Sequence, residues 1–529
     1  MTKGISVGNS GSSATRAMFQ VMALVLPALL ALAVVPASLW AQDTIVYNFQ
    51  GPFAVPADGS NPNGGLVADS AGNLYGTTAA GGNLGTGCPD PGCGVLYKLT
   101  PTLGGFPYTE TVLYYFTGCG ISSCSTPGDG ASPQDTLLID KFANLYGTTS
   151  QGGYGCNANT GCGAVFVYCQ STSGPYCGSV TPPAELVLAV MSPSSSNGRH
   201  PYGQLAMDTY GNLYGTNIGG VYNPNCGSGI AYPGCGSVFV VCAPGVTNPT
   251  DPSPCATGLA SPTYNEIYQF GGVPDGANPF GGLVISAKGI LYGTTASGGK
   301  VNASAEPCAR YIEGSVQPGC GVVFRLAPSG GPIWTETVLY SFLGYPKDGS
   351  YPMDTLVVDS KGDLYGTTDL GPLGGGTVFE LKGTAYAEKI LFKFTNRWDG
   401  GTAYAGVTFD NSYKTLYGAT YSGGGGNNGA VFELDLIGAT WKEPAATLPV
   451  ANSALWSFTP SSGVHGQCAP SSAYSGDGCN PYGGVIPVEV SNSAGTATKY
   501  LFGTTYDGGN GGNSTAFNQG YGTVYAVLP

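Results

Sequence analysis

The stretch DSKGDLYGTT, residues 359–368, ends in the phrase Leu-Tyr-Gly-Thr-Thr, which recurs along the chain. Four identical copies and three variants begin at Leu74, Leu145, Leu213, Leu291, Leu364, Leu416 and Leu501. The copies are spaced by roughly 70 residues, and such internal repetition indicates an architecture in which each unit is one supersecondary structure. This spacing is too long for one coil of a leucine-rich or hexapeptide solenoid.

Each unit contains four short, strand-like segments. In the fifth unit these are residues 355–359, 363–368, 376–381 and 388–394, which are rich in Val, Leu, Tyr and Phe. Such segments, bounded by Gly, Asp or Asn, predict antiparallel β-strands. An Asp-x-x-Gly sequence joins the first two segments, where Gly can adopt a positive φ and Asp can hydrogen-bond the turn backbone. Each unit is therefore predicted to be a four-stranded meander.

Seven meanders predict an all-β fold, a seven-bladed β-propeller of four-stranded antiparallel blades, because radial repetition protects the edges of many small sheets. We expect residues 42–529 to form this single domain. Residues 44–49, TIVYNF, resemble the fourth strand of a unit, and the sequence stops after a third strand at 522–527. The N-terminal strand is therefore expected to complete the last blade and close the ring.

A longer phrase, G-L-x-x-D-x-x-G-x-L-Y-G-T-T followed by G-G and G-x-V-F-x-L, resembles the GloVer repeat of secreted bacterial proteins. The resemblance covers essentially everything after the first 41 residues. It implies an exported, surface-directed bacterial repeat protein without an assigned activity. Many such proteins end in a sorting or anchor segment. This sequence ends on a predicted strand, so a freely secreted or periplasmic product is expected in preference to one anchored at the cell surface.

The composition excludes several classes of protein. Of 529 residues, 88 are Gly and 39 are Pro, which excludes a helix bundle or coiled coil. Charged residues make up 9% and aromatic residues 11%, so the chain can bury apolar surface and is not expected to be disordered. The net charge of −13 is unfavourable for binding nucleic acid or anionic lipid.

The N-terminus has the pattern of an export signal. Lys3 and Arg16 precede an apolar stretch at 21–35, and small residues follow around Ala37 and Ala41. We expect residues 1–41 to be a signal peptide, and its loss would change the net charge from −13 to −15, because it removes two cations and no acid. The apolar stretch is shorter than the roughly 20 residues that span a bilayer, so no stable membrane insertion is expected after cleavage.

All 16 cysteines follow residue 41 and fall into close neighbours in the sequence. The predicted disulfides are Cys88–Cys93, Cys119–Cys124, Cys156–Cys162, Cys169–Cys177, Cys226–Cys235, Cys242–Cys255, Cys308–Cys320 and Cys468–Cys479. Zinc binding is the competing interpretation, but zinc sites favour paired C-x-x-C units or nearby histidines, and this chain has only His200 and His465. Disulfides favour an exported protein.

Two repeated aspartates are predicted to have structural roles. The connection between units carries an Asp-Gly-x-x-Pro phrase, complete or in part, with its acid at Asp58, Asp129, Asp275, Asp348, Asp399 and Asp477. The turn after the first strand of a unit carries Asp69, Asp140, Asp208, Asp359 and Asp410. One carboxylate per turn falls far short of the roughly six to eight oxygens that calcium takes. No cofactor or metal is predicted, although calcium stays an open alternative.

The long loops cluster on one face of the predicted propeller, the loop-rich face, where binding sites usually lie. Aromatic rings in loops can stack on sugars, so the candidate ligand-binding residues are Tyr154, Tyr222, Tyr232, Tyr311 and Trp398. His200 and His465 lack a nucleophile motif nearby and are interpreted as surface residues rather than catalytic bases. Paired carboxylates from different blades stay possible, because they would leave no local trace in the sequence.

Three functions are compatible with the sequence. The leading hypothesis is a monomeric extracellular binding module that contacts a glycan or a protein with its loop-rich face. The second is a hydrolase or lyase that acts on polysaccharide with carboxylates of the central channel. The third is a purely structural surface protein. The fold cannot choose among them, because propellers serve many functions, but an enzyme is not the favoured interpretation.

Overall fold

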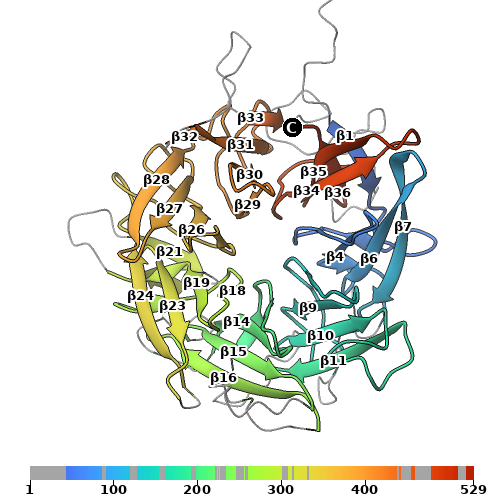
Figure 1. Ribbon diagram of the computed structural model, residues 1–529, viewed down its shortest axis with the longest axis horizontal. Coiled ribbons are helices and arrows are strands. Elements are labelled where there is room, and N and C mark those ends of the chain that lie inside the picture. Colours follow the sequence, from blue (N-terminus) through green and yellow to red (C-terminus); the bar gives the residue numbers. More distant parts are fainter. Residues whose placement is uncertain are drawn as a thin grey trace, which may run out of the picture. The chain divides into compact units, whose positions relative to one another are not determined.

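The computed structural model describes residues 43–85, 88, 91–118, 128–153, 161–191, 198–220, 223, 226, 234–245, 255, 260–300, 308–312, 315–330, 333–437, 440–442, 454–458, 478–509 and 520–529. Asp43–Pro529 forms one compact unit. Seven antiparallel sheets follow one another around a ring in this unit (Figure 1). The predicted all-β, seven-bladed propeller is confirmed. The predicted signal peptide, residues 1–41, lies outside the described residues.

Each blade runs from an inner strand at the channel to an outer strand, and in the first five blades the inner strand is the shorter of the two. In order from the channel outward, the first blade has the strands β3(Val67–Ala68), β4(Leu74–Thr78), β6(Val95–Thr102) and β7(Gly105–Tyr115), and the second has β8(Leu138–Ile139), β9(Leu145–Thr149), β10(Ala164–Cys169) and β11(Ala184–Val190). The third blade has β13(Ala206–Met207), β14(Leu213–Gly219), β15(Ser237–Cys242) and β16(Thr263–Gln269), and the fourth has β18(Val284–Ile285), β19(Leu291–Thr295), β23(Val322–Ala327) and β24(Thr335–Ser341). The fifth blade has β25(Val357–Val358), β26(Leu364–Thr368), β27(Thr377–Lys382) and β28(Ala387–Lys393), and the sixth has β29(Val407–Phe409), β30(Thr415–Thr420), β31(Ala430–Ile437) and, both paired with β31, β32(Thr440–Lys442) and β33(Ala454–Ser457).

The seventh blade joins the two ends of the unit. Its strands are β34(Ile486–Ser491), β35(Ala497–Thr505), β36(Thr523–Val527) and β1(Asp43–Asn48). Strand β1 pairs antiparallel with β36, from Asp43 opposite Val527 to Asn48 opposite Thr523. The predicted closure of the ring by the first strand is confirmed.

Short strands outside the main blade order reinforce the loop-rich face and its loops. They are β2(Gly59–Ser60) with β5(Ala80–Gly81), β17(Gly276–Ala277) with β20(Ser297–Gly298), β21(Ala309–Ile312) with β22(Ser315–Pro318), and β12(Arg199–Pro201), which pairs with β14.

The repeated Leu-Tyr-Gly-Thr-Thr phrase forms the second strand of each blade, and each residue has its own packing role. In β9, Leu145 is fully buried, and the hydroxyl of Tyr146 donates to Asp140 at 2.9 Å. Gly147 faces the ring of Phe166, where an added Cβ would lie 2.6 Å from the ring. The phrase therefore recurs because the same close contact between strand and aromatic ring recurs in every blade.

In four blades the first threonine of the phrase ties the blade to the next one. Its hydroxyl donates to a backbone carbonyl of the following blade in the pairs Thr216–Gly281, Thr294–Asp354, Thr367–Ala405 and Thr504–Gly64, at 2.9 to 3.1 Å. The second threonine stays within its own blade: Thr149, for example, accepts from the amide of Ala164 at 3.1 Å.

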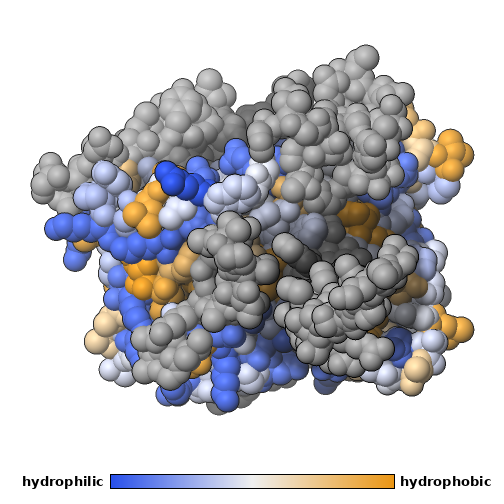
Figure 2. Space-filling view, turned by 90° about the horizontal axis from the view of Figure 1, so that it is seen from above, coloured by the Kyte–Doolittle hydropathy of each residue, from blue (hydrophilic) through white to orange (hydrophobic). Residues whose placement is uncertain are grey.

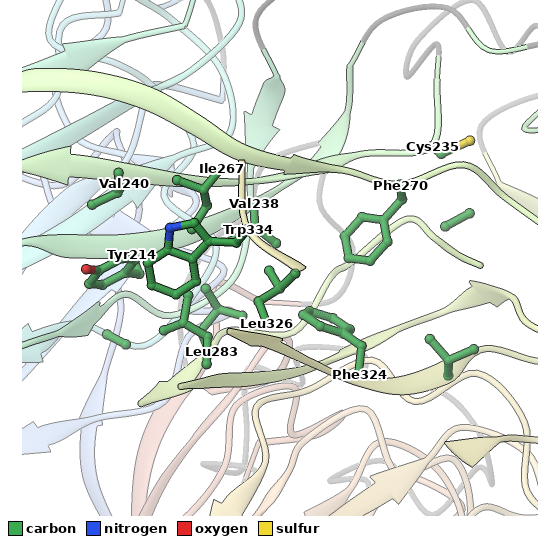
Figure 3. Close-up of a cluster of buried hydrophobic side chains, with 14 of the residues drawn as sticks. Tyr214, Cys235, Val238, Val240, Ile267, Phe270, Leu283, Phe324, Leu326 and Trp334 are labelled. Atoms are coloured by element: carbon green, nitrogen blue, oxygen red, sulfur yellow. The ribbon is translucent and has the colours of Figure 1, made fainter. Parts of the chain in front are cut away.

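Apolar side chains fill the space between adjacent blades. Between the third and fourth blades, Tyr214 and Val238 pack with Leu283, Phe324 and Trp334, all buried (Figure 3). Aromatic rings meet edge to face in this layer and its equivalents, as aromatic pairs prefer. The core is thus a ring of inter-blade layers, each built from two neighbouring units.

Five of the predicted disulfides are present: Cys88–Cys93, Cys169–Cys177, Cys226–Cys235, Cys242–Cys255 and Cys308–Cys320. Cys162 and Cys479 are also disulfide-bonded. Their expected partners, Cys156 and Cys468, and the pair Cys119 and Cys124 lie outside the described residues. These bonds indicate an oxidising environment. Within the described part of the chain, no helix is long and apolar enough to cross a membrane.

Candidate functional site

The Asp-Gly aspartates hold their own loops. The carboxylate of Asp58 accepts from the hydroxyl of Tyr47 at 2.9 Å and from the amides of Gln50 at 2.8 Å and Gly59 at 2.6 Å. The same tyrosine contact is made in three further loops, by Asp129 with Tyr114, Asp275 with Tyr268 and Asp348 with Tyr340. Asp399 instead accepts from Thr395, and Asp477 lies outside the described residues. These contacts occupy the carboxylates within the scaffold.

The aspartates of the other turn act as caps. Asp69 accepts from the amides of Ala71 at 2.9 Å and Asn73 at 3.0 Å, from the side-chain amide of Asn73 at 2.7 Å, and from the hydroxyl of Tyr75 at 3.0 Å. Asp140 and Asp208 repeat this set of contacts. Hydrogen bonds therefore surround these oxygens within the turn.

The aromatic candidates are not brought together by the described structure. Tyr154, Tyr222 and Tyr232 lie outside the described residues, and Tyr311 lies on β21, where side chains are not described. Trp398 is 53% exposed in the loop that enters the sixth blade and packs against Gly425. Trp398 is thus the one candidate whose described side chain is open to a ligand.

The interpretation of His200 as a surface residue is wrong. Its side chain is 3% exposed, and its Nδ1 lies 2.7 Å from the carbonyl oxygen of Ser150 in the preceding blade. Burial lowers the pKa of this imidazole. At the equivalent position of other units, Asn61, Asn278 and Asn480 make the same inter-blade contact. His200 fills an asparagine's place in the scaffold. His465 lies outside the described residues.

The inner strands surround a central channel with a cavity of about 700 Å³. Its wall is largely apolar and includes Leu66, Val284, Val357 and Ile486. Asp354 and Asp410 are the charged side chains among its described lining residues. Asp354 follows the loop that enters the fifth blade, so it lies at the loop-rich end of the channel.

A ring of seven side chains, which we call the channel mouth, surrounds this end. They occupy the position after the proline of the Asp-Gly-x-x-Pro phrase, or its equivalent in the sixth unit, and are Asn63, Gln134, Tyr202, Phe280, Met353, Tyr404 and Tyr482. They line a smaller cavity of about 40 Å³, which shares Thr136, Asp354 and Gly484 with the channel. The rings of Tyr202 and Phe280 meet at 5.4 Å, and those of Tyr404 and Tyr482 at 5.1 Å.

The next residue in each unit is small except in two blades. The seven positions hold Gly64, Asp135, Gly203, Gly281, Asp354, Ala405 and Gly483. Glycine suits this position because neighbouring blades touch there: an added Cβ on Gly281 would lie 2.5 Å from the backbone oxygen of Asp354. The two aspartates therefore place two carboxylates, from the second and fifth blades, where the repeat otherwise has no polar side chain.

Backbone amides fix both carboxylates. Asp354 accepts from the amide of Thr355 at 2.5 Å and from the amide of Gly406 in the next blade. Asp135 accepts from the amide of Thr136 at 2.6 Å and from that of Gln204 in the next blade. Two backbone amides, one of them from the next blade, thus hold each carboxylate in place along the ring.

Both channel carboxylates have a raised pKa. For Asp135 the larger cause is burial, and the negative charge of Asp354 adds to it. Burial also raises the pKa of Asp354, although its amide partners oppose the shift. Burial and a neighbouring negative charge both favour the protonated form of a carboxyl group, so this pair favours keeping a proton near neutral pH.

A cluster of four tyrosines extends the mouth over the sixth and seventh blades. Tyr404 contacts Tyr421 at 5.2 Å and Tyr482 at 5.1 Å, and Tyr482 contacts Tyr506 at 6.3 Å. Behind them lies Asp507, which is 7% exposed and whose pKa burial raises to about 7. Among the described residues, neither a cation nor a hydrogen-bond donor contacts its carboxylate. Its charge acts on the neighbouring Tyr421 and Tyr506.

Sequence reasoning missed both carboxylates and the tyrosine cluster. The signal was present as a departure from the repeat: Asp135 and Asp354 stand where four other units have Gly. Tyr421 and Tyr506 stand where the other units have Ala79, Ser150, Ile218, Ala296 and Asp369. An alignment of the seven units with one another would have shown these residues as exceptions.

No group of three or more His, Cys, Asp and Glu side chains that could hold a metal ion occurs among the described residues. The expectation about calcium stays a prediction.

On the face drawn in Figure 2, hydrophobic residues form separate patches among hydrophilic ones.

Comparison with known proteins finds the fold alone. No family model matches the chain, and no curated protein matches its sequence. The similar solved structures include the periplasmic gluconolactonase of Pseudomonas aeruginosa, with 12% identity over 73% of this chain and 84% of that one, and a TM-score of 0.39. A luciferin-regenerating enzyme has 11% identity over 92% of this chain and 95% of its own, with a TM-score of 0.34. The calcium-binding protein regucalcin from Agrobacterium tumefaciens has 12% identity over 71% and 86%, with a TM-score of 0.33. Likeness at this level says nothing about the chemistry of this chain.

Proposed function

We propose that this protein is an exported binding module that takes an extracellular glycan at the channel mouth on its loop-rich face. One observation carries the proposal: Asp135 and Asp354 stand where the other units have Gly or Ala, and they line the same cavity as the four aromatic side chains of the channel mouth. Carboxylates accept hydrogen bonds from sugar hydroxyls, and the apolar faces of aromatic rings pack on sugar rings.

The departure from repetition is what favours binding over a purely structural role. A residue that serves the scaffold is needed in every blade, as the Asp-Gly aspartates are. Two carboxylates and a tyrosine cluster that occur in only some blades are not required by the repeat, and they meet at one end of the channel. Side chains on a rigid scaffold that converge in this way are typical of binding sites.

Export is supported by three features. The disulfides require an oxidising compartment, the first 41 residues have the pattern of a signal peptide, and the repeat resembles the GloVer repeat of secreted proteins. The acidic net charge of the chain is unfavourable for binding nucleic acid, so it favours a ligand of another class.

The test is binding of residues 42–529, produced in an oxidising compartment, to a panel of glycans and polysaccharides, with product release followed in the same samples. We expect saturable binding without turnover. The variants Asp135→Asn and Asp354→Asn keep an acceptor for the backbone amides and are expected to weaken binding at least about tenfold, or about 1.4 kcal/mol. Glu489→Gln, at an exposed position on β34, is the matched control and should bind normally.

Other outcomes would separate the alternatives. Product release that Asp135→Asn or Asp354→Asn abolishes would support a polysaccharide-acting enzyme in place of a binding module. Binding that neither variant changes would place the site elsewhere. Absence of binding to every glycan would contradict the proposal and favour a protein ligand or a structural role.

A further inference from the structure

The charged groups at the channel mouth are all acids. The described residues that line the mouth cavity include Asp135 and Asp354, whereas Asp410 lines the channel at its other end, in the turn after β29. The described lining residues of both cavities contain no Lys, Arg or His. Asp507 adds a buried carboxylate behind the tyrosine cluster. The negative charge at this end of the channel is therefore not neutralised by a described lining residue.

An independent observation concerns Asn63, which lines the mouth and is 9% exposed. Its side-chain amide donates to the Oε1 of Gln134, which also accepts from the hydroxyl of Tyr202 at 3.2 Å. The Oδ1 of Asn63 is buried and has no hydrogen-bond partner. A buried acceptor without a donor is costly, and a ligand that supplies the donor removes that cost.

The acids and this amide oxygen demand the same kind of ligand. Ionised carboxylates and the amide oxygen accept hydrogen bonds, and no Lys, Arg or His is among the described residues that line the mouth. An ammonium group has three donors, no acceptor and a positive charge, and it is also attracted to the faces of aromatic rings. Tyr202, Phe280, Tyr404 and Tyr482 supply such rings at the mouth. A hydroxyl can donate too, but it carries no charge to balance the carboxylates.

We infer that the glycan bound at the channel mouth carries free amino groups, as the sugars of a deacetylated amino-sugar polymer do. This inference rests on the proposed function and names its ligand class. The ammonium group lies among the carboxylates of Asp135 and Asp354 and the Oδ1 of Asn63, and the sugar ring packs on the aromatic side chains of the mouth. Asp507 strengthens the negative field from behind Tyr421 and Tyr506.

Binding of a cation displaces the proton held by these acids. A ligand with a permanent positive charge should therefore bind more tightly as the pH rises and the carboxylates ionise. Tyr421 and Tyr506, the titratable groups beside Asp507, have raised pKa values and stay neutral over this change. Choline suits this measurement because its own charge does not titrate.

The experiment compares glucosamine oligomers with N-acetylglucosamine oligomers of equal length by calorimetry near neutral pH, where both the amino groups and the mouth carboxylates can carry charge. The two ligands share a backbone and differ in the charged amino group. We expect the deacetylated oligomer to bind at least about tenfold more tightly, and higher salt to reduce this difference. Choline should bind more tightly than the neutral alcohol in which a tert-butyl group replaces its trimethylammonium group.

Three variants test the residues. Asp354→Asn and Asp507→Asn should each weaken binding of the deacetylated oligomer several-fold, and Tyr482→Leu should weaken binding of both oligomers. Glu489→Gln and Tyr210→Leu, at exposed positions on β34 and in the turn between β13 and β14, are the matched controls. Thermal unfolding establishes that each variant is folded, and Tyr482→Leu tests the mouth should an aspartate variant fail to fold.

The outcomes separate this inference from the proposed function. Equal or tighter binding of the acetylated oligomer overturns the requirement for an amino group and leaves glycan binding in place. Binding of neutral glycans without binding of the deacetylated oligomer would also overturn the requirement for an amino group and leave glycan binding in place. Binding of choline and lysine peptides without any glycan overturns both, since the ammonium group would then come from a protein. Absence of binding to all probes also overturns both.

Discussion

The hydroxyl of Thr504 donates a hydrogen bond of 2.9 Å to the carbonyl oxygen of Gly64, although the two residues are 440 positions apart in the chain. The contact joins the seventh blade to the first, and Thr504 is fully buried. The same bond joins other neighbouring blades, so the junction between the first and last units has the chemistry of an ordinary blade contact.

We expect Thr504→Val to lower the free energy of unfolding by about 1–3 kcal/mol, because it leaves the buried carbonyl of Gly64 without a donor. Urea unfolding followed by tyrosine fluorescence measures this change. The control is Thr102→Val, which removes an exposed bond of 3.1 Å to Phe106 and should change stability by less than about 0.5 kcal/mol. Equal effects of the two variants would show that the inter-blade bond adds nothing.

A methyl group on the repeat glycine should not fit. An added Cβ on Gly366 would lie 2.7 Å from the ring of Phe379, in a fully buried layer. We expect Gly366→Ala to destabilise the protein by about 1–3 kcal/mol through overpacking. Gly178→Ala is the matched control, because nothing lies within 4 Å of its added Cβ. A stable Gly366→Ala variant would mean that the aromatic layer can shift to make room.

Stability should depend on pH through a repeated pair of acids. The outer strands of four blades carry a glutamate whose pKa is raised from 4.5 to about 7, first by burial and then by the charge of the Asp-Gly aspartate; these glutamates are Glu110, Glu185, Glu336 and Glu388. The folded protein therefore binds more protons than the unfolded chain between these two pH values. The contribution of these glutamates to stability is therefore largest below about pH 4.5, and it should fall as the pH rises to about 7.

Thermal unfolding at a series of pH values checks this prediction. Glu336→Gln and Glu388→Gln together should flatten the decline, and Glu489→Gln should leave it unchanged. The lowered pKa values of Asp69 and Asp410 act in the opposite sense, but at more acidic pH. A midpoint of unfolding that rises from pH 5 to pH 7 would contradict the prediction.

The disulfides should stiffen loops without being needed for the fold. Cys169–Cys177 closes a loop with a sequence separation of 8 residues. Its replacement by a pair of alanines should cost about 2–3 kcal/mol, the magnitude expected for a short closed loop. Urea unfolding measures the cost, and near-ultraviolet circular dichroism tests whether the packed core persists. Loss of the core in this variant would show that the bond holds the blade together.

The fold could be predicted because its determinants are local and repeated. The contact of Gly147 with Phe166 needs a glycine in one strand and an aromatic residue in the next, and the sequence shows both in every unit. The pairing of β1 with β36 could also be predicted, because the first segment resembles a fourth strand. The same reasoning paired five sets of cysteines correctly.

The candidate site could not be predicted in the same way. Asp135 and Asp354 come from different blades, and nothing in the residues beside either of them marks it as part of a pair. The aromatic candidates are predicted from their position in loops, whereas the aromatic residues of the mouth stand at the end of the loops that enter the blades, after a proline in all but the sixth unit. The absence of a nucleophile motif near His200 indicates a surface residue, yet His200 takes the place of a buried asparagine.

The pairing of β1 with β36 sets the order in which the ring can be completed. The first strand of the unit to be synthesised is the partner of the last, so its edge stays open until almost the whole unit has been made. Contacts this distant in sequence form slowly, and open strand edges can pair with other chains in the meantime. The newly made chain is therefore most vulnerable to aggregation just before its final strand arrives.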